Sequence, residues 1–372
     1  MTKSFAFRAD AAIDIGTGHV MRCLTLADAL ALRGAECHFI CREHAGNLIE
    51  LIRGKGHVVH TLPLVADAGS DSNPNCPGTP ATELAHGHWL GSTQAQDAIA
   101  SSASLARLRP DWLIVDHYAL DERWERALKP YCRKLMVIDD LADRPHLCDL
   151  LLDQTLGRDP QDYRTRVPTD CHLLCGARYA LLRPDFAALR HYSLQRRTIP
   201  ALRQLLITMG GIDSGNATGQ VLEALRSSVL PPDCRITVLM GPAAPWLESV
   251  RNQAHHMPWP TRVLVGVNDI ARLMADSDLA IGAAGSTSWE RCCLGLPSIM
   301  LVLAANQRQA ARNLEQAGAA LLIGREGDFP EHLIECLTRL IKNPGQLQHI
   351  SRAASKIVDG HGIDAAIQHL MA

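Results

Sequence analysis

The sequence lacks an excess of charge of either sign. Its 372 residues include 37 Lys and Arg against 39 Asp and Glu, which gives a formal net charge of −2, and no segment is an extended run of basic residues. Such a run or patch is typical of proteins that bind nucleic acid or anionic membranes. We therefore expect neither nucleic acid nor a membrane as a partner.

The sequence also lacks a hydrophobic run long enough to cross a bilayer. The longest uncharged apolar stretch, residues 294–305, is interrupted by Pro297 and is shorter than the roughly 20 residues that a spanning helix needs. Residues 1–5 show neither the apolar core nor the small-residue cleavage site of a secretory signal. The sequence therefore predicts a cytoplasmic protein.

Motifs for metal or disulfide chemistry are absent as well. None of the twelve cysteines belongs to a C-x-x-C pair, and several, such as Cys23, Cys37 and Cys41, lie inside apolar segments. This pattern is typical of reduced, buried thiols. The seventeen histidines include no H-E-x-x-H motif. We expect no metal and no cofactor.

What the sequence does contain is a regular alternation of apolar strands with helix-patterned segments. Residues 4–9, 37–41 and 58–62 read as strands, and the alternation resumes at residues 205–208 after a basic, polar stretch. Alternation of this kind indicates an α/β fold with parallel, doubly wound sheets, and the length exceeds that of one core. We expect a Rossmann-like domain at 1–190, a linker at 191–203 and a second Rossmann-like, nucleotide-binding domain at 204–372.

The most distinctive stretch lies between the first strand and the first helix and contains Gly16, Gly18 and His19. Glycines let the backbone approach a ligand, and a helix N-terminus attracts a phosphate or a developing anion. A neutral imidazole at His19 could take a proton from water near pH 7. Alternatively, the glycines only shape the turn and His19 is a solvated residue at a helix start.

Polar residues follow two further strands of the first half. Asp116 and His117 follow residues 112–115, and Asp139 and Asp140 follow residues 135–138. The carboxyl ends of parallel strands gather at one ligand-facing edge, so we expect these residues near His19. Asp116 and His117 could instead hydrogen-bond each other. The paired aspartates could bind a divalent cation or be neutralised by the nearby Arg144.

The second half repeats the arrangement of strand, small residues and helix, most clearly at residues 279–290. There, hydroxyl side chains at a helix start can donate to a diphosphate, and Glu290, one turn later, can accept from two ribose hydroxyls. A bare helix cap is the alternative. A long loop at residues 67–91 is rich in Gly, Ser, Asn and Pro and reads either as a lid near a ligand or as a plain insertion.

Together these stretches resemble the GT-B architecture, in which two Rossmann-like domains of a nucleotide-sugar enzyme face each other across a cleft. Within it, the chain is most similar to the family of UDP-2,4-diacetamido-2,4,6-trideoxy-beta-L-altropyranose hydrolases of pseudaminic acid biosynthesis. The segments that carry the resemblance are residues 8–10 with 15–24, 115–118, 138–144, 285–290 and 306–307. Loop 67–91 lies beyond the family pattern.

The resemblance implies a metal-independent hydrolysis that releases UDP and a free 6-deoxy diacetamido sugar. His19 matches the family's general base, Tyr118 and Asn306 match residues that line the sugar, and Glu290 matches the ribose-binding carboxylate of the wider fold. We expect the substrate to contact Gly16, Gly18, Arg22, Tyr118, Asn306 and Gln307, and the nucleotide to contact Gly210, Gly211, Asn268, Gly285, Ser286, Thr287, Ser288 and Glu290.

Three alternatives remain open at this point. A glycosyltransferase of the same fold would use an acceptor hydroxyl in place of water, and a hydrolysing UDP-N-acetylglucosamine 2-epimerase would add inversion at C2. A nucleotide-binding module without catalytic activity is the third.

Overall fold

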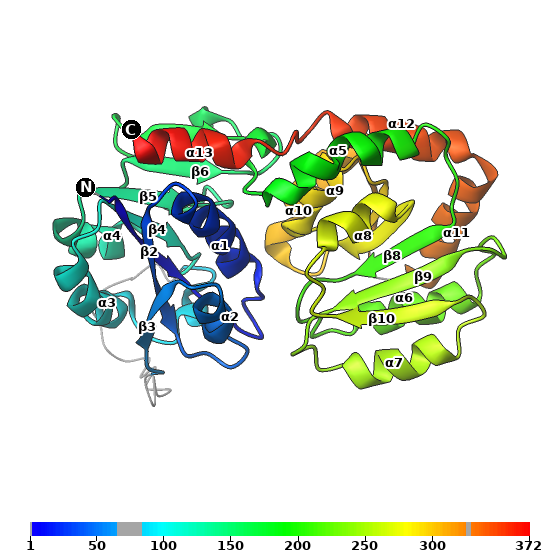
Figure 1. Cartoon of the computed structure of the whole chain (residues 1–372), viewed down its shortest axis with the longest axis horizontal. Coiled ribbons are helices and arrows are strands. Elements are labelled where there is room, and N and C mark those ends of the chain that lie inside the picture. The colour runs from blue at the N-terminus through cyan, green and yellow to red at the C-terminus, as the bar shows by residue number, and fades with distance from the viewer. Residues whose placement is uncertain (1, 65–83, 325–328) are drawn as a thin grey trace, which may run out of the picture. The chain divides into compact units, whose positions relative to one another are not determined.

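A computed structural model describes residues 2–64, 84–324 and 329–372 (Figure 1). The chain forms two compact units. Unit 1 comprises Met1–Gln154, Arg158–Cys175 and Ala366–Ala372, and unit 2 comprises Thr155–Gly157 and Gly176–Ala365. Residues 67–83 of the expected loop lie outside the described residues. Among the described residues, no helix combines the length and the apolar character that crossing a membrane would require.

Unit 1 is built on a seven-stranded parallel sheet with the order β3-β2-β1-β4-β5-β6-β7. Its strands are β1 (Ser4–Ala9), β2 (Glu36–Arg42), β3 (Val58–Leu62), β4 (Trp112–Asp116), β5 (Lys134–Ile138), β6 (Leu150–Asp153) and β7 (His172–Cys175). The central strands are buried on both faces, as expected for a parallel sheet covered on both sides. The order reverses between β1 and β4, which is the switch point where doubly wound sheets bind ligands.

The helices of unit 1 include α1 (Gly18–Ala31), α2 (Ile49–Gly54), α3 (Gln94–Leu108), α4 (Glu122–Leu128) and most of α13 (Gly362–Met371). The end of α13 is fixed beside the start of β1, where Lys3 Nζ donates to the Met371 carbonyl at 2.6 Å. Residues at the end of the chain therefore complete the first unit, which the sequence pattern did not indicate.

Unit 2 repeats the design with a six-stranded parallel sheet of order β10-β9-β8-β11-β12-β13. Its strands are β8 (Gln204–Thr208), β9 (Arg235–Met240), β10 (Thr261–Val265), β11 (Leu279–Ala283), β12 (Ser298–Leu301) and β13 (Leu321–Ile323). Its helices are α5 (Pro184–Arg196), α6 (Ala217–Arg226), α7 (Leu247–His255), α8 (Ile270–Asp276), α9 (Thr287–Cys293), α10 (Arg308–Gln316), α11 (Phe329–Lys342) and α12 (Pro344–Ser355). The switch point falls between β8 and β11.

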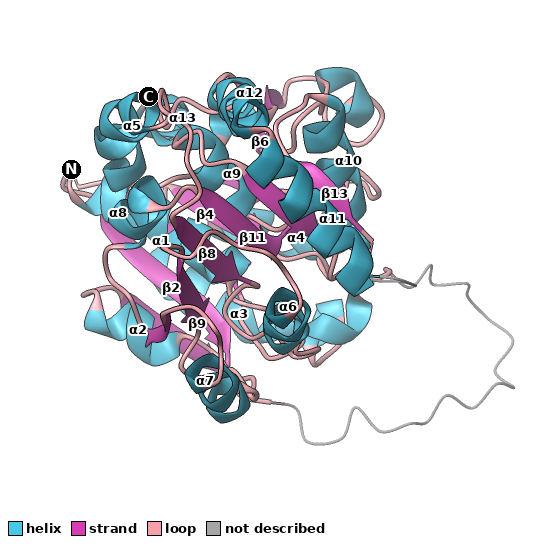
Figure 2. Ribbon diagram, turned by 90° about the vertical axis from the view of Figure 1, so that its right-hand side faces the viewer, coloured by secondary structure: helices cyan, strands magenta, loops and turns pink. Residues whose placement is uncertain are grey.

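Helices cover the strands on both faces (Figure 2). In unit 2, Leu205 and Ile207 of β8 pack in a core with α6 and α11. Leu206, which points to the opposite face, packs in a second core with residues of α5, α8 and α9. This alternation is the period-2 pattern of a strand buried on both sides, and the expected α/β fold with two doubly wound sheets is confirmed.

The residues expected to form a linker adopt a different structure. The division between the units falls at 175/176, and α5 covers residues up to Arg196. The sequence predicted a linker from this basic, polar stretch, but two of its arginines bind backbone carbonyls inside unit 2. Arg190 donates to the carbonyl of Val358 at 3.1 Å, and Arg197 donates to that of Ser277 at 2.8 Å. These arginines therefore hold α5 against the rest of unit 2.

A buried ion-pair network fixes α3 to the sheet of unit 1. Asp97 is 0% exposed and accepts hydrogen bonds from Arg8 Nη2 and Arg42 Nη2, each at 2.7 Å, and from Trp124 Nε1 at 2.9 Å. Burial by itself raises the pKa of Asp97, but Arg8 and Arg42 outweigh it and hold the pKa below its ordinary value.

We predict that Asp97→Asn lowers the free energy of unfolding at pH 7 by about 3 to 5 kcal/mol, because it leaves the buried Arg42 without its anion and Arg8 with Asp10 alone. Since the folded pKa is depressed, the stabilisation is complete above the unfolded value of about 3.9 and is lost as the pH falls through the folded pKa.

Urea denaturation at pH 7 and pH 3 checks this expectation. Glu50→Gln is the matched control, because Glu50 pairs with Arg53 on the surface and should cost less than about 1 kcal/mol. Equal stability of the two variants at pH 7 would contradict the prediction.

Candidate active site

His19 stands at the start of α1, directly after the switch-point turn. The turn is closed by the Gly16 N–H, which donates to the carbonyl of Ala12 at 2.8 Å. Gly16 has φ 80°, a backbone conformation that glycine adopts without strain. Thr17, the N-cap, makes no side-chain hydrogen bond to the helix. The helix therefore begins with His19 held close to free backbone N–H groups.

The His19 imidazole is paired with a carboxylate from the neighbouring strand. Asp116, the last residue of β4, lies opposite Ala9 of β1, and its Oδ1 is 2.6 Å from His19 Nδ1. This contact assigns the proton to Nδ1 and leaves the lone pair on Nε2. Among the described residues, Nε2 has no hydrogen-bond partner. This arrangement is suited to a general base.

Arg22, one turn further along α1, holds Asp116 from the other side. Its Nε lies 2.6 Å from Asp116 Oδ2 and its Nη2 lies 2.7 Å from Oδ1, which is a bidentate ion pair. Burial by itself raises the pKa of Asp116, but Arg22 and then His19 outweigh it and hold the pKa well below its usual range. Asp116 is therefore an anion at neutral pH.

The structure corrects the expected role of Arg22. We predicted a substrate contact, but Nη1 donates to Asp140 Oδ2 at 2.6 Å, so each nitrogen of the guanidinium is already engaged. The side chain is also buried. Arg22 therefore positions Asp116, and through it His19.

Aromatic side chains form one wall beside His19. The Tyr118 ring meets the imidazole edge-on, with centroids 4.5 Å apart, and its hydroxyl donates to Asp140 Oδ2 at 2.7 Å. Trp89 stacks on Tyr118 at 5.8 Å, and His86 lies 4.3 Å from Trp89. The structure thus brings Tyr118 next to His19. The sequence analysis did not single out Trp89, because this residue lies at the end of loop 67–91 and belongs to no recognised motif.

His117 does not pair with Asp116. Its Nδ1 accepts from the Ala119 N–H at 3.1 Å, and its Nε2 lies 3.3 Å from Asp10. Because the Nδ1 lone pair is occupied, and because burial lowers the pKa of His117, this imidazole is neutral and structural.

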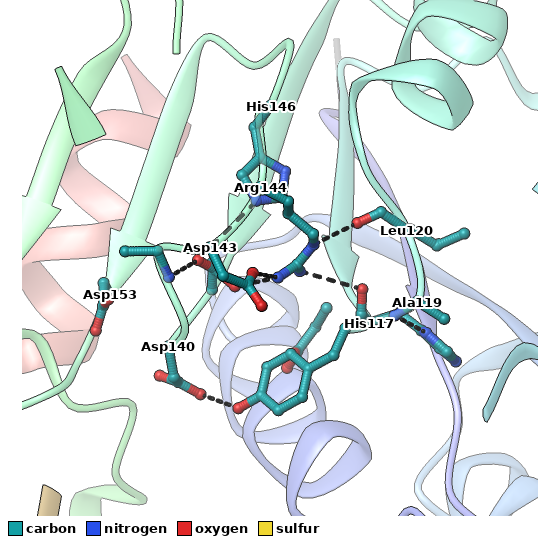
Figure 3. Close-up of polar contacts among 12 residues, drawn as sticks. His117, Ala119, Leu120, Asp140, Asp143, Arg144, His146 and Asp153 are labelled. Atoms are coloured by element: carbon teal, nitrogen blue, oxygen red, sulfur yellow. Dashed lines mark hydrogen bonds and ion pairs between the residues drawn. The ribbon is translucent and has the colours of Figure 1, made fainter. Parts of the chain in front are cut away.

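The adjacent aspartates Asp139 and Asp140 face different partners. Asp139 accepts from Arg144 Nη1 at 2.9 Å and from Tyr163 Oη at 2.7 Å, whereas Asp140 binds Arg22 and Tyr118. Figure 3 shows Asp143, Leu120 and His117 arranged around the guanidinium of Arg144. Of the two aspartates, Asp139 is therefore the one that Arg144 neutralises. The described residues contain no group of three or more side chains placed to hold a metal.

In unit 2, the loop before α9 presents some of the expected groups. Ser286 is exposed, and Gly285 lies near Gln307, whose Nε2 would be 3.8 Å from a Cβ added at the glycine. Ser288 differs from expectation. Its side chain is buried, and its hydroxyl accepts from Arg291 Nη2 at 2.9 Å and contacts Met300 Sδ. The Ser288 hydroxyl is therefore bound inside unit 2 and does not face the loop in which the sequence predicted a phosphate donor.

Glu290 projects from the same helix without a hydrogen-bond partner among the described residues. Burial raises its pKa to about 7, while Arg183 and Arg291 act in the opposite direction more weakly. A half-buried carboxylate without a partner is suited to accept hydrogen bonds from a ligand.

A side chain of the glycine turn after β8 caps the helix that follows the turn. Asp213 accepts from the N–H groups of Ala217 and Thr218 at 2.8 Å each, so the start of α6 already carries a carboxylate. Gly210 and Gly211 therefore do not open onto a free helix N-terminus. A Cβ built on Gly241 would lie 2.0 Å from the Gly211 carbonyl, so two backbone segments are in close contact there.

The remaining expected residues lie at other strand ends of unit 2. Asn268 is exposed, and its carbonyl accepts from Arg183 at 3.3 Å. Asn306 has a buried Oδ1 with no partner among the described residues. Gln307 Oε1 accepts from the Leu303 N–H at 2.9 Å, which fixes its amide. The expected residues of unit 2 thus lie after several different strands of its sheet.

The pair of sheets, each with its own switch point, defines the GT-B architecture, and solved structures agree. MurG from Acinetobacter baumannii has a TM-score of 0.69 at 15% identity, with 99% of each chain covered. The UDP-GlcNAc 2-epimerase from Neisseria meningitidis bound to UDP-GlcNAc has a TM-score of 0.61 at 12% identity, with all of both chains covered. At these identities the likeness concerns the fold.

Sequence comparisons confirm the resemblance. Residues 218–363 match the glycosyltransferase family 28 C-terminal domain. The chain is 26% identical over 314 residues to the UDP-2,4-diacetamido-2,4,6-trideoxy-beta-L-altropyranose hydrolase of Campylobacter jejuni, which covers 84% of this chain and 96% of that protein.

Two further relatives match over part of their length. The chain is 30% identical over 206 residues, 54% of its length, to the spore coat polysaccharide biosynthesis protein SpsG of Bacillus subtilis. It is 23% identical over 304 residues, 81% of its length, to an uncharacterised protein of Methanocaldococcus jannaschii. These matches span 59% and 56% of the two relatives.

The raised pKa of Glu290 generates a prediction about stability. Because the folded pKa of about 7 lies above the unfolded value of about 4.3, stability should fall as the pH rises between these two values. Glu290→Gln removes the charge that burial disfavours. We expect this variant to be more stable than the unaltered protein at pH 8, by on the order of 2 kcal/mol after allowing for partial exposure, with little difference at pH 4.

Denaturant unfolding at both pH values measures this difference. Glu315→Gln on the exposed surface of α10 is the control and should change little at either pH. A loss of stability in Glu290→Gln at pH 8 would mean that the carboxylate has a partner that stabilises its charge.

Proposed function

We propose that the protein hydrolyses a UDP-linked 2,4-diacetamido-2,4,6-trideoxy sugar to UDP and the free sugar, by attack of water at the anomeric carbon, in nonulosonic (pseudaminic) acid biosynthesis. The observation that carries the proposal is the His19–Asp116 pair, in which Nε2 keeps its lone pair and has no partner among the described residues. The similarity to the Campylobacter jejuni hydrolase over most of both chains supports the choice of substrate.

In this proposal His19 Nε2 takes a proton from water as the new C–O bond forms. The Asp116 carboxylate, held in its charged form by Arg22, stabilises the imidazolium. UDP is a good leaving group, so one base suffices and no acid is needed. Unit 2 contributes the nucleotide contacts, with Glu290 accepting from the ribose hydroxyls and Gly285, Ser286 and Thr287 near the diphosphate.

Two alternatives keep specific support. The family 28 match and the MurG-like fold favour a UDP-sugar glycosyltransferase, and the epimerase neighbour favours a hydrolysing UDP-N-acetylglucosamine 2-epimerase. Incubation of the isolated protein with a panel of 2,4-diacetamido UDP-sugars and UDP-N-acetylglucosamine separates them. UDP release without an acceptor supports hydrolysis, inversion at C2 supports the epimerase, and dependence on an acceptor supports the transferase. Binding without turnover would indicate a nucleotide-binding module.

We predict that His19→Asn lowers the rate of UDP release by roughly 10² to 10⁴ and leaves UDP affinity nearly unchanged, because a positioned base contributes about that much to catalysis. Asparagine keeps a polar side chain of similar reach but cannot accept the proton. Steady-state kinetics and calorimetric titration with UDP measure the two quantities.

His88→Asn is the matched control, since His88 is an exposed histidine of the short 3-10 helix Gly87–Leu90 that precedes α3. Its rate should stay within about twofold of the unaltered protein. Near-normal turnover in His19→Asn would show that His19 is structural.

A second prediction concerns the bond that breaks. If His19 activates water for attack on the anomeric carbon, the bond between C1 and oxygen breaks and C1 is inverted in a single displacement. In ¹⁸O-labelled water the label should then appear in the free sugar and be absent from UDP.

Mass spectrometry of both products soon after quenching measures the label. A control with unlabelled free sugar corrects for exchange at the reducing end. Label in UDP would mean attack on phosphorus, and the proposed role of His19 would then be wrong.

A further inference from the structure

Arg291, on α9 of unit 2, is a buried cation with few partners. It is 1% exposed, and its Nη2 donates to the Ala283 carbonyl at 2.7 Å and to Ser288 Oγ at 2.9 Å. Its Nε and Nη1 are buried without a hydrogen-bond partner, and among the described residues it forms no ion pair. A buried charge of this kind is costly unless an anion compensates it.

A second buried arginine of the same unit, Arg197, has its positive charge compensated by backbone carbonyls. Arg197 donates to the carbonyls of Met274, Ala275 and Ser277, which lie at the C-terminal end of α8. The last carbonyls of a helix have no intrahelical partner, and they carry partial negative charge. Arg291 binds one carbonyl and one hydroxyl, and both flank the start of α9 instead. Burial lowers the pKa of both arginines to about 10, so both are cations at neutral pH.

The sheet makes room for this guanidinium at the switch point. A Cβ built on Gly282 of β11 would lie 2.2 Å from Arg291 Nη1 and 2.7 Å from the Thr208 carbonyl at the end of β8. Only glycine therefore lets the charge lie between the ends of the two central strands. With seven residues, α9 is too short for its dipole to hold an anion alone, so the local positive field comes mainly from Arg291.

We propose that Arg291 is a positioning residue for the diphosphate of the nucleotide: its buried, uncompensated charge attracts the phosphates to residues 284–287 without touching them. This inference rests on the proposed nucleotide binding by unit 2. It specifies a nucleoside diphosphate as the preferred ligand, because the attraction grows with each phosphate charge. Because Arg291 is buried, its charge acts over several ångströms and is screened by salt less than an exposed charge would be.

Calorimetric titration with UDP, UMP and uridine tests the inference on the full chain. In Arg291→Met we expect the dissociation constant for UDP to rise about tenfold or more and that for UMP about threefold, with uridine within about twofold. Arg291→Lys keeps the charge and should bind UDP within about threefold of the unaltered protein. Arg197→Met, the matched control, should leave the ratio of UDP to uridine affinity unchanged.

A purely structural role would weaken all three ligands by the same factor, and that result, or an unchanged UDP affinity, would overturn the inference while leaving nucleotide binding intact. Failure of the unaltered protein to bind UDP would instead reject the proposed function on which it rests.

If Arg291→Met does not fold, thermal unfolding of the unaltered protein and of Arg291→Lys provides the test. Inorganic pyrophosphate should raise the melting temperature of both more than inorganic phosphate does at equal ionic strength. Equal shifts for the two anions in the unaltered protein would overturn the inference.

Discussion

The carboxylate of Asp116 is the group on which the site of unit 1 depends. It lies at the end of β4 and receives His19 and Arg22 from one face of α1, so a single anion fixes both side chains. Arg22 keeps the carboxylate charged, and the charged carboxylate keeps the proton on His19 Nδ1. The chemistry assigned to Nε2 therefore follows from an ion pair behind the imidazole.

Around this pair, unit 1 satisfies its buried charges within the protein. Asp97 binds Arg8 and Arg42, and Asp139 binds Arg144. Such networks are strongly destabilised when one partner is lost, and they hold side chains in one geometry. Several ion pairs therefore hold side chains at these strand ends, which suits a base that must meet a water molecule in a defined place.

Unit 2 treats charge differently near α9. Glu290 and Arg291 are neighbours in sequence, but among the described residues neither forms an ion pair, and burial disfavours the charged form of each. Groups that are left uncompensated in the free protein reduce its stability, and they are suited to a ligand that carries the missing partners. A nucleoside diphosphate offers ribose hydroxyl donors to Glu290 and the negative charge of its phosphates to Arg291.

The sequence by itself determined the α/β class, the strands of both sheets and the placement of His19 at a helix start. These features depend on local periodicity and on glycine at a turn, which neighbouring residues specify. Only the tertiary structure decided the partner of His19, because Asp116 is 97 residues away and meets it through the order of the strands. The same holds for Arg22 and Ser288, whose side chains point inward. The direction of a side chain depends on its angular position around the helix and on how the helix packs against the sheet. A motif recognised along the sequence contains neither piece of information.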